Sequence, residues 1–75
     1  MVKMKSFKKW ANANGYSIEK QANDWAIIGV EGNGRKEPIG LGNHANDRIP
    51  DRVIQEIAFR LGKDKAVMED EINEY

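Results

Sequence analysis

The sequence contains no cysteine and, among its 75 residues, only two prolines and one histidine. Without cysteine the chain can form neither disulfides nor a thiolate metal site, and a single histidine without neighbouring ligands does not make one. The longest apolar run, residues 25–30, is interrupted by a glycine and is too short to cross a membrane. No apolar segment of the signal-peptide kind follows the N-terminal lysines. These absences predict one small, soluble, cytoplasmic domain without a cofactor.

The net charge is zero, which argues against a dedicated strong nucleic-acid binder, but the charges are unevenly distributed. Residues 1–20 hold five lysines and one glutamate, whereas residues 63–75 hold two lysines and five acidic residues. The two ends of the chain therefore have opposite charge, and each could face the other or meet a different partner.

The first predicted helix begins after Ser6, whose hydroxyl suits an N-cap, and ends at Gly15. Phe7, Trp10 and Ala11 follow helical spacing and predict one buried stripe. The opposite side is basic.

Three strands are predicted next, at residues 16–21, 25–31 and 35–41. Residues 22–24 and 32–34 have turn composition and separate them. The second strand is the most apolar and is expected at the centre of the sheet, while Pro38 places the third strand at an edge.

A second helix is predicted from Pro50 to Leu61, with Gly62 ending it. Its apolar stripe is formed by Val53, Ile54, Ile57, Ala58 and Leu61. After it, Asp64 is a candidate cap for a short acidic helix or tail in which Met68, Ile72 and Tyr75 form a thin apolar line.

The element order predicts an α+β fold, α-β-β-β-α, in which a three-stranded antiparallel sheet carries two helices on one face. Residues 1–62 are expected to form the domain, with residues 63–75 as an acidic C-terminal extension. Double-stranded-RNA-binding domains have the same layout.

Two stretches carry a resemblance to a known family: Phe7-Lys8-Lys9-Trp10 followed by Gly15, and His44 to Ile49 leading into the second helix. In these residues the chain resembles the HicA toxins. The resemblance implies a double-stranded-RNA-binding-like fold, mRNA as substrate and a HicB-like antitoxin as protein partner.

The chain departs from the family where the chemistry is expected. The family's catalytic histidine lies at the beginning of the second strand, and residues 22–25 here contain none. Asp24 is a poor replacement as a general base, because an ordinary carboxyl group titrates near pH 4. The prediction is therefore no enzymatic activity, with His44 as the one weak catalytic candidate.

Other candidates concern binding. Lys5, Lys8 and Lys9 could meet phosphates or simply form a solvated helix face. Arg48 and Arg52 could extend that patch, and His44 could contact a phosphate or be an ordinary loop residue. Trp25 could be part of the core or an exposed anchor for a partner.

Three functions remain open. The first is a HicA-like RNA-binding regulator without catalysis. The second is a protein-binding inhibitor or decoy of the kind that phages and other mobile elements encode, acting on an antitoxin or a host protein. The third is an active mRNA interferase that uses His44. The acidic extension could cover the basic surface, attract a basic partner or only aid solubility.

Overall fold

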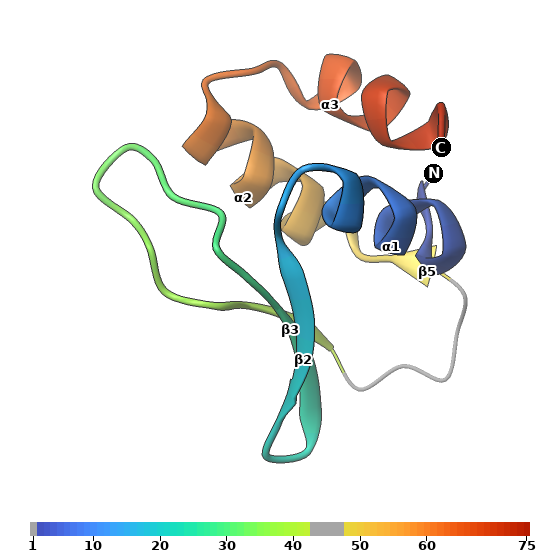
Figure 1. Ribbon diagram of the computed structural model, residues 1–75. Coiled ribbons are helices and arrows are strands. Elements are labelled where there is room, and N and C mark those ends of the chain that lie inside the picture. Colours follow the sequence, from blue (N-terminus) through green and yellow to red (C-terminus); the bar gives the residue numbers. More distant parts are fainter. Residues whose placement is uncertain (1, 43–47) are drawn as a thin grey trace.

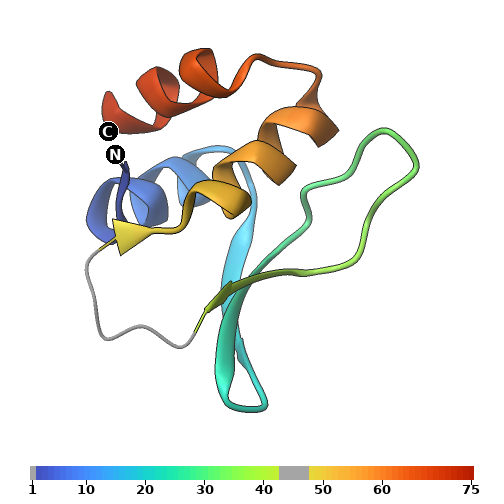
Figure 2. The ribbon, with the colours of Figure 1, turned by 180° about the vertical axis from the view of Figure 1, so that it is seen from behind.

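The computed structural model describes residues 2–42 and 48–75 and shows an α+β fold built in layers (Figure 1). The first layer is an antiparallel sheet of β2 (Ser17–Gln21), β3 (Asp24–Ile28) and β4 (Ile39–Gly42), with β3 in the centre. The helices α1 (Met4–Ala13) and α2 (Asp51–Leu61) cover one face of this sheet. A third helix, α3 (Lys65–Asn73), packs against both of them on the side away from the sheet (Figure 2).

One hydrophobic core lies between these layers. Helix α1 contributes Phe7 and Trp10, and the sheet contributes Ile27 and Leu41, all fully buried. From α2 the buried apolar residues are Val53, Ile54, Ile57 and Ala58. The fold class, the central strand and the two-helix layer are as the sequence predicts, although Leu61 is only partly buried at the margin of the core.

The start of α1 differs from the prediction. Ser6 is not the N-cap: α1 begins at Met4, and Lys3 occupies the cap position without a side-chain hydrogen bond. The reason is a short strand pair that the sequence pattern did not indicate. β1 (Val2–Lys3) pairs antiparallel with β5 (Arg48–Ile49), so the chain enters α1 directly from a strand with Val2 already buried.

The helix ends follow the prediction. Gly15 and Gly62 both have positive φ angles, +80° and +68°, which glycine adopts without strain. The amides of Tyr16 and Lys63 donate to carbonyls five residues back, as in a Schellman motif. The start of α2 differs by one residue: Pro50 was predicted to begin the helix, but it is the N-cap, and the helix begins at Asp51.

Two predicted strand boundaries are wrong. The central strand ends at Ile28 rather than at residue 31, because Gly29 takes a φ of +103° and turns the chain away. The third strand begins at Ile39 rather than at residue 35. The expected turn at Asn33 and Gly34 exists, with both φ angles positive, but it lies in the middle of a ten-residue loop, residues 29–38.

The loop at residues 29–38 (loop 29–38) lies beside the C-terminal half of α2 (Figure 1). Arg60, whose side chain is only 3% exposed, fastens it there. Its guanidinium donates to the carbonyls of Val30 and Glu37 at 2.9 and 2.7 Å and also pairs with the carboxylates of Glu37 and Glu56. Every charged atom of this buried side chain is thus matched, as burial of a cation requires.

The acidic segment after residue 62 belongs to the same core. Asp64 caps α3 by accepting from the Ala66 amide at 2.8 Å, as predicted. Met68 and Ile72 are fully buried among residues of α1 and α2, whereas Tyr75 is 44% exposed and stays outside the apolar line. Glu71 binds the indole N–H of Trp10 and the ammonium group of Lys63.

Candidate functional site

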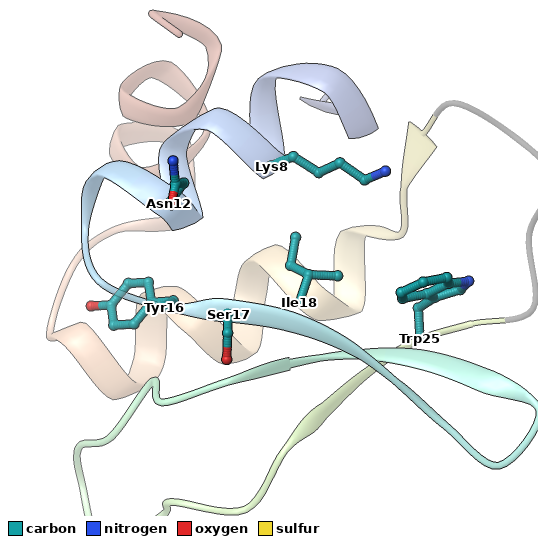
Figure 3. Close-up of a pocket in the computed structure, with 6 residues that line it drawn as sticks. All are labelled: Lys8, Asn12, Tyr16, Ser17, Ile18 and Trp25. Carbon is teal, nitrogen blue, oxygen red and sulfur yellow. The ribbon is translucent and has the colours of Figure 1, made fainter.

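An open cleft of about 410 Å³ lies between α1 and the hairpin formed by β2 and β3 (Figure 3). The residues that line it, called the cleft below, are Lys8, Asn12, Tyr16, Ser17, Ile18 and Trp25. The side chains of Lys8, Ile18 and Trp25 point into the same space, and that of Ser17 points to the other side of the strand. The volume falls within the range of roughly 300–1,000 Å³ that small-molecule sites have.

The strand register explains why Trp25 stands open. Trp25 and Ile27 share the helix-facing side of β3, because alternate residues of a strand point the same way. Ile27 is covered by the helices, but Trp25, two residues nearer the hairpin tip, is 47% exposed. On the β4 side its register partner is Gly42, which has no side chain to cover the indole, and the register shifts at this point.

The same register places Lys20 beside Trp25, although the sequence alone did not indicate Lys20 as a site residue. Lys20 lies directly opposite Trp25 on β2, and Ile18 lies opposite Ile27. Paired residues of an antiparallel ladder share a face, so the aliphatic and cationic side chains of β2 flank the indole. The alternation of residues 16–21 was visible in the sequence. The pairing of Lys20 with Trp25 needed the length of the turn, which is two residues, Ala22 and Asn23.

Among the described residues, the charged side chains that border the cleft are all cationic. Lys5, Lys8 and Asn12 have helical spacing and lie on one side of α1, a helix without acidic residues. Lys9 is exposed on the same helix. On the hairpin, the nearest carboxylate along β2 is Glu19, which points to the opposite face and accepts from the Ser17 hydroxyl at 3.1 Å. Among the described residues, Lys5, Lys8 and Lys20 make no ion pair.

The two tryptophans contrast sharply in their surroundings. Trp10 is fully buried, its ring packs against Phe7 and Tyr16, and its N–H donates to Glu71 at 2.9 Å. Hydrogen bonds from the Lys63 ammonium and, to a smaller extent, from this indole hold the pKa of Glu71 below its ordinary value. Trp25 has no hydrogen-bond partner or ring contact within the part of the chain that the structure describes. Trp25 is therefore exposed rather than part of the core, and its role as an anchor for a partner stays a prediction.

The arginines predicted to extend the basic patch have different positions. Arg48 is exposed and lies opposite Lys3 in the β1–β5 pair, close to the start of α1, so two like charges are adjacent there. Arg52 donates to the carbonyl of Gly40 at 3.0 Å and covers part of the outer edge of β4. His44 lies outside the described residues, so its predicted role stays a prediction.

The acidic helix α3 does not cover the cleft. Within residues 2–42 and 48–75, the acidic residues of α3 pair with Lys63 and with Lys65 of the same helix, and none pairs with Lys5, Lys8 or Lys9. Lys65 also pairs with Asp51 of α2. Among the described residues, no direct pairing therefore supports the idea that the C-terminal acids screen the basic helix.

The carboxylate next to Trp25 in the sequence does not belong to the cleft. Asp24 alternates with Trp25 along β3 and so points away from the cleft. No group of three or more potential metal ligands occurs among the described residues. None of the helices in these residues has the length and apolar character needed to cross a membrane.

Comparison of the chain with models of known protein families finds no match, and neither does comparison with curated proteins or with solved structures.

Proposed function

We propose that this protein is an RNA-binding module that acts without cleaving RNA, and that the cleft and the basic side of α1 form its binding surface. The observation that carries the proposal is the exposed Trp25 indole, flanked by Lys8 and Lys20, with no carboxylate among the described residues that line the cleft. An aromatic platform next to unpaired cations is the combination by which proteins bind exposed bases and the phosphates that join them.

A second argument comes from the cost of the arrangement. Lys5, Lys8 and Lys9 lie at spacings of three and four residues on α1, where like charges repel by a few tenths of a kcal/mol per pair. No acidic residue on α1 offsets this repulsion. A polyanionic ligand would relieve it, because it supplies the missing counter-charge. The HicA resemblance points in the same direction and stays a prediction.

The direct test is a titration of fluorescently labelled single-stranded and duplex RNA with the full-length protein at several salt concentrations. We expect binding that weakens steeply as salt rises, because each phosphate contact releases condensed counterions. Lys8→Gln should weaken binding and lower the salt slope by about 0.7–1. The matched control is Lys36→Gln, an exposed cation of loop 29–38 on another part of the surface. The proposal is wrong if no RNA binds at low salt.

The absence of cleavage is tested on the same RNAs. Incubation with the protein at neutral pH should leave the RNA intact, because no imidazole lies at the beginning of β3. Cleavage that disappears in His44→Ala would instead establish the interferase reading.

A protein partner is the second candidate. An exposed tryptophan is a frequent anchor at protein interfaces, and the net charge of the chain is zero. This reading is supported if Trp25→Ala abolishes the capture of a specific protein while no RNA binds. A HicB-like antitoxin or a host protein would then be the partner to seek.

A further inference from the structure

We infer that the cleft holds an unpaired stretch of one or two nucleotides, with one base stacked on Trp25, so that the preferred ligand is single-stranded RNA rather than a duplex. This inference rests on the proposed function and adds the form of RNA that the site accepts. It follows from the shape of the cleft, the accessibility of the indole and the placement of the cations.

The cleft has the size of a small ligand. A volume of about 410 Å³ accommodates a planar base with its sugar but not a double helix. Domains that bind duplex RNA do so across about 16 base pairs, by contacts to sugars and phosphates rather than by stacking. Bases inside a duplex are stacked on each other and cannot stack on a side chain, whereas an unpaired base can.

The walls of the cleft match the parts of a nucleotide. The Trp25 indole offers an open ring face, and Ile18 forms an apolar surface beside it (Figure 3). Lys8, from the helix, and Lys20, from the opposite strand, flank this platform and can each meet a phosphate. Farther along α1, the carboxamide of Asn12 is both donor and acceptor and can hydrogen-bond a sugar or a base edge.

The chain keeps this platform open by specific means. Gly42 opposite Trp25 has no side chain, and the helices cover Ile27 but leave Trp25 uncovered. Ala22, in the two-residue turn before Trp25, has a φ of +54°, a strained value for a residue other than glycine. The hairpin tip is thus built by a tight turn that places Lys20 and Trp25 opposite each other.

The experiment compares a single-stranded RNA of eight nucleotides, a blunt RNA duplex and free adenosine monophosphate, each titrated into the full-length protein at low salt. Tryptophan fluorescence reports directly on the site, since Trp10 is buried and bonded to Glu71 while Trp25 is exposed. We expect the single strand to bind more tightly than the duplex and to quench the emission. Free nucleotide should bind at the same site but more weakly, because it lacks the neighbouring phosphates.

Three substitutions separate stacking from other effects. Trp25→Ala and Trp25→Leu should each weaken single-strand binding about 5- to 100-fold, since leucine keeps apolar surface but offers no ring face. Trp25→Phe should retain most of the affinity. The control is Phe59→Ala, which removes an aromatic ring of similar exposure, 49%, from α2.

The outcomes distinguish the inference from the function on which it rests. If the duplex binds at least as tightly as the single strand, and Trp25→Ala changes nothing while Lys8→Gln weakens binding, the inference is wrong and the proposed function stands. If neither RNA binds the folded protein, the proposed function fails as well. If free nucleotide binds as tightly as the single strand, the ligand is a small nucleotide and not a strand, which also overturns the inference.

Discussion

Two regions of the molecule carry an exposed aromatic ring beside cationic side chains, and the two rings have different partners. Phe59 is exposed on α2, and the guanidinium of Arg35, from loop 29–38, lies 4.8 Å from the centre of its ring. Arg35 also pairs with Glu56 of α2 at 2.7 Å. In the cleft, Trp25 has Lys8 and Lys20 beside it, and within the described residues neither lysine has a carboxylate partner. The cation beside Phe59 thus has a carboxylate partner, whereas the cations beside Trp25 have none among the described residues.

The difference shows where the charges serve the fold and where they are available for a ligand. Around Arg60, loop 29–38 approaches α2 so closely that a side chain on Gly32 would overlap the Arg60 carbonyl. Asn33 donates from its side chain to the carbonyl of Phe59 in the same region. Polar groups that are saturated in this way stabilise the fold and leave little for a partner to bind.

The largest effect is expected from removing Arg60, because the polar groups of loop 29–38 and α2 that meet there are saturated by it. This part of the molecule is called the saturated region below. Arg60→Ala leaves the Val30 and Glu37 carbonyls without their shared donor and removes one partner of Glu56. It should lower the free energy of unfolding by about 3–5 kcal/mol, because each buried acceptor left without a partner costs about 1–3 kcal/mol. A chain of this length has roughly 4–11 kcal/mol in total, so the variant should be largely unfolded on warming. Urea titration measures the loss, with Lys36→Ala as the control. A loss below about 1 kcal/mol would show that the clamp is unimportant.

A comparable loss is expected from the core contact of α3. Ile72→Ala should cost about 2–5 kcal/mol, because Ile72 is fully buried between the helices. The matched control is Val67→Ala on the same helix, where the side chain is 55% exposed and the change should stay within about 0.5 kcal/mol. Equal stability of the two variants would mean that residues 63–75 are an extension after all.

Acid should weaken the contacts around Arg60 in the saturated region, and Glu56 is the residue that tests this. Hydrogen bonds from Arg60, and then from Arg35, hold the pKa of Glu56 below its ordinary value of 4.5. The unfolded chain therefore takes up protons before the folded protein does, and stability falls as the pH drops through 4.5 towards the folded-state pKa. Thermal melts between pH 7 and 3 should show this decline, with a smaller decline in Glu56→Gln. Identical pH profiles for the two proteins would contradict the assignment.

A smaller effect of opposite sign concerns the turn beside the cleft. Ala22→Gly should raise stability by about 1 kcal/mol, because glycine adopts the positive φ of this position without strain. Urea titration again measures the change. If the variant is less stable than the parent, the turn is not strained at Ala22.

The sequence predicted those parts of the fold that local patterns determine. The stripe of α2, the buried Trp10 and the terminating glycines Gly15 and Gly62 all follow from spacing and backbone preference. Arg60 could not be recognised, because a cation at the end of a helix resembles a surface residue. Its partners are backbone carbonyls 23 and 30 residues away, which no local pattern indicates.

The candidate site was predicted only in part, because some of its residues follow from local patterns and others from tertiary contacts. Lys5, Lys8 and Lys9 followed from the polar side of the helix, and Trp25 was left between core and anchor. Which of the two applies depends on how far the helices extend over the hairpin, a tertiary feature: they cover Ile27 but not Trp25. Lys20 entered the site only through the pairing of β2 with β3.

The central claim is that the cations of the cleft serve a ligand and not the fold. The most direct test uses one triple variant that carries Lys5→Gln, Lys8→Gln and Lys20→Gln. Its RNA binding at low salt and its unfolding in urea are both measured and compared with the parent. The claim predicts that RNA binding falls at least tenfold while the free energy of unfolding stays within about 0.5 kcal/mol of the parent or rises, because repulsion on α1 is relieved. Unchanged RNA binding, or a loss of stability of several kcal/mol, would contradict it.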